Sequence, residues 1–308
     1  MTIAVLTYKR PHLLPRALGS VARQTYKPLE VYVVDDATPG TENEEIVRSF
    51  KKKIPGLVYI KRPQHVGCNK NYLFCTEQAK GEFILWLCDD DEISPTFVEA
   101  SVEVLLEHPE ASFSAAYQEL ALYEKECTTF PESYMDDSWF RRALIFTITN
   151  GCGQEGWMRG LSWEYGVHRT EAWHEAIKRS LEKFPYWWPN RDVEAASDCL
   201  FLLEALLIGK VVPVTDKKTI LTTYCNTEKE YTFPGGNAPG FIANQMDKLR
   251  GAIFWVNIYW INTKQVYLRG GLLYAIPFAA LCCTILGYKL ALSLFQQLDR
   301  RVRAILPS

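Results

Sequence analysis

The sequence predicts an α/β fold in which a mostly parallel sheet is flanked by helices. Three observations predict it. Short apolar runs alternate with amphipathic stretches through the first half of the chain. Each helical stretch lies between two apolar runs, as the crossover connections of parallel strands require. Polar residues follow three of the runs, where strands of such a sheet present their carboxyl ends to ligands.

The expected strands are short β-rich runs, namely Ile3–Leu6, Leu29–Val34, Leu57–Ile60 and Glu82–Leu87. Helical periodicity lies between and after them. The predicted helices are one with Leu14, Leu18 and Val21 on one face, one across Thr41–Lys53, one across Asn69–Ala79, and one from Pro95 with Phe97, Val98, Val102, Leu105 and Leu106 inward. Gly81 is expected to close the third helix as its C′ residue.

The second half of the chain is less regular. Residues 119–160 contain several turn-forming glycines and are expected to form a loop-rich insertion over the edge of the sheet. The elements expected after it are a strand at Trp163–His168, helices at Thr170–Phe184 and Ala195–Leu207, and a strand at Val211–Val214. His168 is a weak site candidate, because a lone histidine is more often structural.

The C-terminal region, 241–308, differs in character. Leu272–Phe295 is almost wholly apolar, with Lys289 its one charged residue, and Arg300, Arg301 and Arg303 follow it. The length and the trailing arginines favour membrane association on the cytoplasmic side. Pro277, Gly287 and Lys289 leave a span, a re-entrant hairpin and a helix lying in the interface all open. The alternative is a buried helix or an oligomer contact.

Composition excludes some classes of protein. The 308 residues have a formal net charge of −2, so nothing global indicates a nucleic-acid partner. The nine cysteines form no Cys-x-x-Cys pair, which favours reduced thiols and a cytosolic setting over a disulfide framework or a zinc site. The first residues lack the basic lead and long apolar run of a signal peptide.

The most informative feature is a strand that runs into three adjacent carboxylates, Asp89, Asp90 and Asp91, after Cys88. Crowded carboxylates are costly unless a cation or hydrogen-bond donors meet them. Oxygen ligands suit Mg²⁺ or Mn²⁺, and a diphosphate can complete such a site. The alternative is N-capping of the helix after Pro95, but one aspartate suffices for that role.

Several segments occur in a characteristic order: Val5–Pro11, Gln24–Tyr26, Glu30–Thr38, Gly67 with Asn69–Asn71, Gly81-Glu82, and Asp89–Asp91 with Pro95. In this series the chain resembles the family 2 glycosyltransferases, over about residues 2 to 225. The resemblance implies a GT-A fold, and an enzyme that transfers sugar with inversion. Many relatives have Asp-x-Asp-Asp at the acidic motif, and here Cys88 takes the first place.

The resemblance also implies roles for individual residues. Thr7, Tyr8 and Arg10 would belong to the donor site, with the Tyr8 ring against the nucleotide base. Asp36 would accept a hydrogen bond from the base, which suits uracil and hence a UDP-linked donor. The remaining assignments are Asp89 at the ribose or diphosphate, Asp90 and Asp91 at the metal, and Lys70 neutralising diphosphate charge. Each of these residues also has a purely structural alternative: Tyr8 packs at a strand end, Asp35-Asp36 caps a turn, and Lys70 is a solvated charge on a helix.

Inverting transfer needs a base on the acceptor side, because the attacking hydroxyl must lose its proton. Residues 194–201 resemble the family segment that carries this base, and Asp198 matches its aspartate. A first-turn aspartate favoured by the helix dipole is the alternative. The Gln-x-x-Arg-Trp signature of processive relatives is absent from the sequence, so addition of a single sugar is expected.

The resulting expectation is a single-sugar transferase at the cytoplasmic face of a membrane. Its partners would be a nucleotide-sugar donor and a glycan or lipid-linked acceptor. Residues 1–240 would form the GT-A domain, with about 1–100 as the nucleotide-sugar half and 101–240 as the acceptor half. Region 241–308 would be a membrane-associated helical region. A nucleotidyltransferase of similar fold and a non-catalytic sugar-binding protein are the alternatives.

Overall fold

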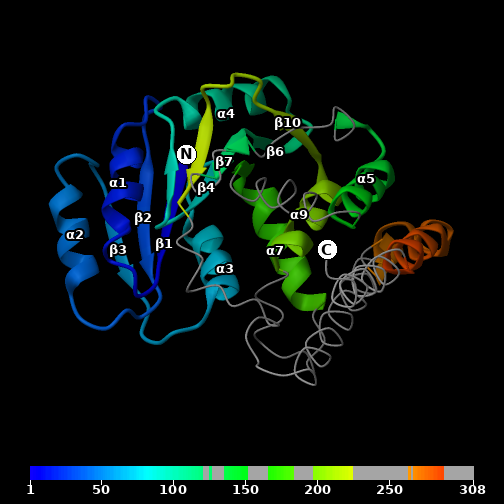
Figure 1. The fold of residues 1–308 in the computed structure, drawn as a ribbon, viewed down its shortest axis with the longest axis horizontal. Helices are drawn as coiled ribbons and strands as arrows, with labels where there is room; N and C mark the ends of the chain where they lie inside the picture. Colours follow the sequence, from blue (N-terminus) through cyan, green and yellow to red (C-terminus); the bar gives the residue numbers. More distant parts are fainter. Residues whose placement is uncertain are drawn as a thin grey trace, which may run out of the picture.

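The computed structural model describes residues 1–120, 125–126, 135–151, 166–183, 197–224, 263–264 and 266–287. Within them, helices cover both faces of a seven-stranded sheet of order β10-β6-β9-β4-β1-β2-β3 (Figure 1). The strands are β1 (Thr2–Thr7), β2 (Glu30–Asp35), β3 (Val58–Lys61), β4 (Phe83–Cys88), β6 (Ala111–Ala115), β9 (Val167–Arg169) and β10 (Lys210–Pro213). Strand β9 is antiparallel to both neighbours and the other pairings are parallel. The predicted fold class is therefore confirmed.

Side chains of the central strands point alternately into two cores, one on each face. In β4, Phe83, Leu85 and Leu87 lie in one buried cluster, while Ile84 and Trp86 lie in the other. The first cluster is shared with α1 (Leu14–Ala22), α2 (Glu42–Phe50) and α4 (Phe97–Glu107). The second is shared with α3 (Cys68–Gln78), α5 (Trp139–Gly151), α7 (Thr170–Lys183) and α9 (Ser197–Ile208). A continuous apolar run such as β4 is typical of a strand buried on both faces.

His168 belongs to the core and not to the functional site. Its side chain is 1% exposed and stacks between Phe113 and Trp173, with ring centroids 4.8 and 3.8 Å away. Trp173 in turn contacts Trp86 at 5.0 Å. This column of rings joins β6, β9, α7 and β4, so the structural interpretation of His168 holds.

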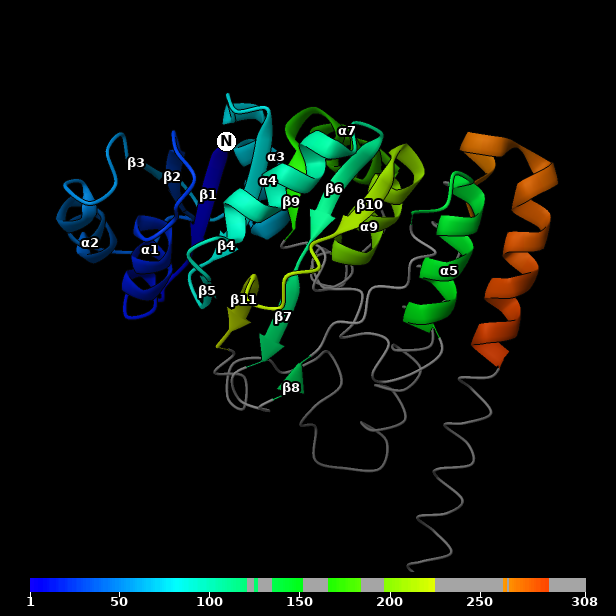
Figure 2. The ribbon, with the colours of Figure 1, turned by 90° about the horizontal axis from the view of Figure 1, so that it is seen from above.

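A second sheet of order β5-β11-β7-β8 lies beyond the carboxyl end of β4 (Figure 2). Its strands are β5 (Asp91–Ile93), β7 (Tyr117–Leu120), β8 (Lys125–Glu126) and β11 (Ile220–Thr223). Strand β5 begins only three residues after β4 ends. The acidic triple is thus the connection between two sheets, which no sequence pattern described above predicts.

Three expectations about local structure are wrong. Leu106 is 61% exposed, because the core side of α4 is filled by Val98, Val102 and Leu105. Gly81 is no left-handed C′ residue, since α3 ends at Gln78 with an extended C-cap at Ala79. A Cβ at Gly81 would lie 2.8 Å from the Met1 backbone, and this close approach explains the glycine.

The third wrong expectation is the loop-rich insertion at 119–160, because its described part includes the 13-residue helix α5.

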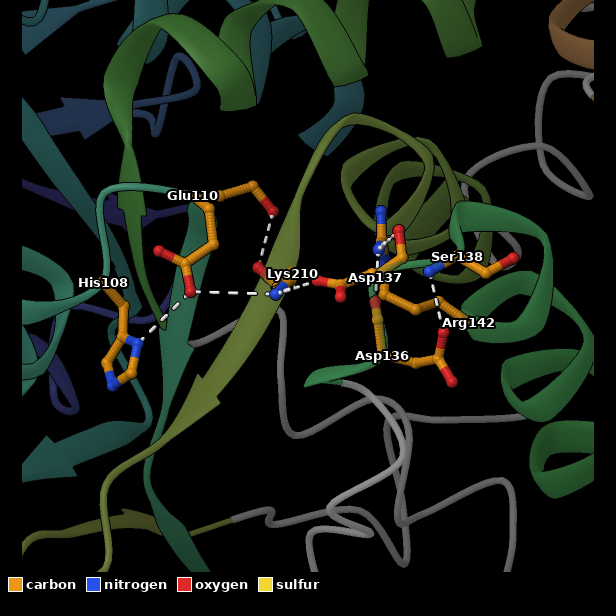
Figure 3. Close-up of polar contacts among 8 residues, drawn as sticks. His108, Glu110, Asp136, Asp137, Ser138, Arg142 and Lys210 are labelled. Carbon is orange, nitrogen blue, oxygen red and sulfur yellow. Dashed lines mark hydrogen bonds and ion pairs between the residues drawn. The ribbon is translucent and has the colours of Figure 1, made fainter.

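A polar network fixes the start of α5 against the sheet (Figure 3). Lys210 lies 2.5 Å from Asp137 and 3.8 Å from Glu110, while the buried Arg142 donates to the carbonyls of Asp136 and Leu206 at 2.6 and 2.9 Å. Glu110 and Lys210 stand at the amino ends of β6 and β10, so this network is structural and lies opposite the carboxyl ends of the strands.

The described C-terminal residues form helical stretches at 266–270 and 272–287, separated by Gly271 with φ 72°. They lie beside α5 (Figure 2). Phe278 is fully buried in the core cluster that contains Ala143 and Phe146 of α5. Among the residues that the structure describes, no helix has the length and apolarity needed to cross a bilayer.

Candidate functional site

Three neighbouring parallel strands end at one edge of the central sheet. Thr7 at the end of β1 is in register with Asp35 at the end of β2, and β4 lies on the other side of β1. The amide of Asp36 donates to the Thr7 carbonyl at 3.1 Å, and the amide of Asp89 donates to the Leu6 carbonyl at 3.1 Å. The residues that follow the strands are thereby held side by side, at the edge where ligands of open α/β sheets bind.

Arg10 joins two carboxylates of the acidic triple. Its guanidinium lies 2.6 Å from Asp89 Oδ1 and 3.0 Å from Asp90 Oδ2. Burial raises the pKa of Asp89 to about 6, although the neighbouring Arg10 charge opposes the rise. Burial lowers the pKa of Arg10, but Asp89 and Asp90 raise it by more, so the net pKa lies above the ordinary value. Arg10 therefore carries a permanent positive charge beside the acidic triple, and we call this part of the site, Arg10 with Asp89–Asp91, the acidic tip.

Three side chains at this tip have the spacing of a metal site. Cys88 Sγ and a carboxylate oxygen each from Asp90 and Asp91 lie within 4.8 Å of one another. The Asp91 side chain is 1% exposed. Two carboxylates suit Mg²⁺ or Mn²⁺, which are usually bound by one or two carboxylates together with phosphate oxygens. The softer thiol suits other metals better, so Asp90 and Asp91 are the residues that fit a hard divalent cation.

The backbone of the second half of the triple is held by β11 and the residue after it. Asp91 is in antiparallel register with Thr223, and the Tyr224 amide donates to the Asp90 carbonyl at 3.0 Å. The alternative role of the triple as a helix cap is wrong. The N-cap of α4 is Thr96, five residues beyond Asp91, and no side chain caps it.

Tyr8 and Asp36 meet at His65. The Tyr8 and His65 rings stack with centroids 4.2 Å apart and planes 14° from parallel. His65 Nδ1 donates to Asp36 Oδ2 at 2.7 Å, because a carboxylate can only accept. The amides of Val66 and Gly67 donate to the same carboxylate at 2.9 and 3.0 Å. Asp36 thus anchors the loop that leads into α3, and is 4% exposed.

Asp35 shapes the neighbouring turn, as the capping alternative predicts. It accepts hydrogen bonds from the Thr38 amide at 2.8 Å and the Tyr59 hydroxyl at 2.6 Å. The Thr38 hydroxyl in turn accepts from the Lys9 amide at 2.9 Å. Lys9 and Ala37 have φ of 56° and 64°, values that non-glycine residues rarely adopt. Strained backbone of this kind is concentrated at functional sites, where surrounding contacts maintain it.

Lys70 and Asp198 stand apart from this cluster. Lys70 is the third residue of α3 and is exposed; in the described part of the chain, no hydrogen bond or ion pair connects it to the acidic triple. Asp198 is the second residue of α9, and its side chain lies outside the described residues.

His65 is the site residue that the sequence patterns do not reveal. It lies in a polar loop between β3 and α3, where a histidine has no distinctive spacing. Its position two residues before Gly67, whose φ is 85°, is the one available signal.

Comparison with known proteins gives a family match and several relatives. Residues 2–150 match the model described as glycosyl transferase family 2. The chain is 32% identical over 94 residues to a GalNAc(5)-diNAcBac-PP-undecaprenol beta-1,3-glucosyltransferase of Campylobacter jejuni, covering 30% of each chain. It is 34% identical over 85 residues to an N-acetylglucosaminyltransferase of Rhizobium meliloti, covering 27% of this chain and 20% of that one. The matches thus span less than a third of these relatives.

Solved structures share the fold. Residues 1–349 of S. aureus TarS, in complex with UDP, superpose with a TM-score of 0.57 at 17% identity, covering 86% of this chain and 65% of that one. The complex of the same protein with UDP-GlcNAc gives a TM-score of 0.54 at 18% identity, covering 83% and 66%. These likenesses identify the GT-A fold.

Proposed function

Because residues 2–150 of this chain belong to glycosyl transferase family 2, we propose that it moves a single sugar from a nucleotide-sugar donor to a glycan or lipid-linked acceptor, with inversion. The observation that carries the proposal is the meeting of Tyr8, Asp36 and the Asp89–Asp91 triple at one edge of the sheet, with Arg10 bound to the triple. The aromatic ring and the hydrogen-bond acceptor suit the base of a nucleotide sugar, and the carboxylate cluster with its cation suits the ribose and diphosphate.

The donor is a UDP-sugar in this proposal. Tyr8 would contact the uracil ring, and Asp36, which keeps the hydrogen bonds from the Val66 and Gly67 amides, would accept a further one from the base. TarS has the same fold and is known in complex with UDP and UDP-GlcNAc, which supports the choice of carrier. Asp89, buried beneath Arg10, would face the ribose or diphosphate.

Asp90 and Asp91 would hold a divalent cation, Mn²⁺ or Mg²⁺. Such an ion supplies charge stabilisation for the departing diphosphate. Arg10 is already positioned beside Asp90 and adds a second positive charge at the same place. Lys70, exposed at the start of α3, would reach toward the diphosphate once the donor is bound.

Asp198 would act as the general base that takes the proton from the acceptor hydroxyl. Its place in the first turn of α9 puts it in the half of the domain, about residues 101–240, that we assign to the acceptor. Residues 1–100 would then form the donor half. This division is consistent with the positions of the proposed donor residues, because they follow β1, β2 and β4, which lie at the start of the chain.

A lipid-linked acceptor at the cytoplasmic face of a membrane completes the proposal. The Campylobacter jejuni relative is named as a glucosyltransferase for a PP-undecaprenol-linked glycan, which supports an acceptor of this class. The apolar residues of region 241–308 would bring the chain to the same membrane surface.

The test is a donor screen that measures release of nucleoside diphosphate, with Mn²⁺ and with a chelator, in the presence of membrane extracts as acceptor. Release from a UDP-sugar that needs the cation, and that Asp91→Asn abolishes, supports the proposal. Glu107→Gln is the matched control, because Glu107 is an exposed carboxylate on α4. Release of pyrophosphate instead would identify a nucleotidyltransferase.

Asp198→Asn separates transfer from binding. We expect turnover to fall by at least about a hundredfold, the range of general-base catalysis, while the affinity for UDP stays unchanged. Binding without turnover in the unaltered protein would identify a sugar-binding protein without catalysis.

A further inference from the structure

The helical stretch 272–287 is apolar on every side, with no charged residue along its whole length. A helix on a protein surface in water normally carries charged residues on its outer face. A helix that is apolar all round is normally enclosed. This stretch lies at the periphery of the molecule, so its two sides require separate explanations (Figure 2).

The inner side packs against the domain. Phe278, Cys282 and Ile285 are at most 3% exposed and belong to the core cluster shared with α5. The Phe140 ring of α5 contacts the rings of Tyr274 and Phe278, with centroids 4.9 and 6.5 Å away. The inner side is therefore covered by the domain, and only the outer side of this stretch is open to a partner.

The outer side carries large apolar side chains that are exposed to solvent. Leu272, Leu273 and Ile276 are 64%, 79% and 65% exposed, and Ala280 and Cys283 continue the same face one and two turns further on. A row of this kind at a spacing of three or four residues forms a continuous apolar strip. Strips of exposed apolar residues mark sites of association.

The charge of the region identifies the partner. Region 241–308 contains eight basic and two acidic residues, a net charge of +6. The whole chain has −2, so residues 1–240 carry −8. Lys264 and Arg269, both exposed, stand at the amino end of the helical stretches. Basic residues beside an apolar face complement a bilayer with anionic headgroups, whereas a second copy of the chain would bring the same positive charge.

We propose that the outer face of helix 272–287 inserts into the headgroup and upper acyl region of an anionic bilayer, with the helix axis in the membrane plane. The domain then rests on the membrane through α5, and the helix does not cross. This placement deepens the membrane location in the proposed function, but depends on neither the donor nor the metal. The membrane placement can therefore be wrong while the proposed sugar transfer is correct, and sugar transfer can be wrong while the placement is correct.

The test is co-sedimentation of the full chain with vesicles of phosphatidylcholine alone and of phosphatidylcholine with phosphatidylglycerol. We expect binding to the anionic vesicles, and a partition coefficient lowered by about tenfold or more in the double variant Leu273→Asn and Ile276→Asn. Leu106→Asn is the matched control, since Leu106 is also a largely exposed leucine, at 61%, on the distant α4. The substituted side chains are exposed, so the thermal unfolding midpoint should not change.

Leu273→Lys separates insertion from electrostatic attraction. Inserted apolar side chains predict weaker binding of this variant, whereas attraction alone predicts stronger binding, which would overturn the proposal. Equal partition of the double variant and the unaltered protein would also overturn it. So would light scattering that shows a stable dimer lost in the double variant, since a second copy would then cover the face.

The His65 side chain carries a second, independent inference. It makes both contacts that the proposed function assigns to the nucleotide base, because its ring lies flat on Tyr8 at 4.2 Å and its Nδ1 donates to Asp36 at 2.7 Å. Two rings cannot occupy the same face of Tyr8. The His65 side chain is 54% exposed and free to turn outward, while the Val66 and Gly67 amides keep the loop backbone attached to Asp36.

We infer that His65 closes the base site when no nucleotide is present and turns outward when the base enters. The inference rests on the proposed function. Calorimetric titration with UDP tests it, and His65→Ala should bind about fivefold more tightly, since the ring stack and hydrogen bond no longer compete. Equal or weaker binding by His65→Ala would overturn the inference and leave the proposed function intact. If neither protein bound UDP, the proposed function itself would fail.

Discussion

Replacing Arg10 by glutamine tests the electrostatics of the acidic tip directly. Arg10 contacts Asp89 and Asp90, whose side chains are 0% and 15% exposed. Removing one partner of a buried ion pair costs roughly 3–5 kcal/mol, because the remaining charge is left in a medium that solvates it poorly. Arg10 is itself 30% exposed, so solvent offsets part of the loss. We therefore expect a decrease of about 3 kcal/mol in the free energy of unfolding.

Urea unfolding without divalent metal measures this change, which corresponds to about a hundredfold in the unfolding equilibrium. Arg23→Gln is the matched control. Arg23 pairs with Glu92, but their side chains are 53% and 28% exposed, so its loss should cost less than about 1 kcal/mol. The double variant Arg10→Gln and Asp89→Asn should recover at least about 1 kcal/mol of the single-variant loss, because the fully buried carboxylate that Arg10 compensates is then neutral.

Two results would refute this reasoning. The first is a cost for Arg10→Gln no greater than that for Arg23→Gln. The second is a double variant that is no more stable than Arg10→Gln alone, which would mean that Asp89 contributes through contacts other than its charge.

Three further predictions concern stability. Gly81→Ala should lower the thermal unfolding midpoint, because its Cβ would lie 2.8 Å from backbone, whereas Gly287→Ala meets nothing within 4 Å and should not; equal midpoints would contradict the packing. Leu105→Ala should cost about 2–5 kcal/mol in urea and Leu106→Ala less than about 0.5, since they are 0% and 61% exposed; similar costs would contradict the burial. Hydrogen bonds lower the pKa of Glu30 in the folded state despite some burial, so its stabilisation is present above the unfolded pKa and lost in acid. The stability difference between the unaltered protein and Glu30→Gln should therefore shrink as pH falls through that lowered pKa, and a constant difference would contradict it.

The sequence predicts the central architecture well because local and long-range signals agree there. β1, β2 and β4 are continuous apolar runs that end in polar residues, and the structure brings those ends together as expected. Parallel pairing follows from the helices between them. The position of Tyr8, Asp36 and Asp89 at one edge is therefore a consequence of topology alone.

Other features depend on contacts that no local pattern encodes. Strand β5 is three residues long and exists because β11, more than a hundred residues later, pairs with it. His65 reaches Tyr8 only because Asp36 binds the intervening loop backbone. The glycines of residues 119–160 favour a loop prediction there. The helix α5 forms because its apolar residues pack against the distant α9 and the C-terminal helix.

Calorimetric titration of the folded protein with UDP, with and without Mn²⁺, tests the central claim most directly. A cation site at Asp90 and Asp91 predicts that Mn²⁺ tightens UDP binding by about tenfold or more. It also predicts that Asp90→Asn with Asp91→Asn removes this dependence, while Glu107→Gln keeps it. Binding of UDP that is equally tight with a chelator present, or no binding of any nucleoside diphosphate, would contradict it.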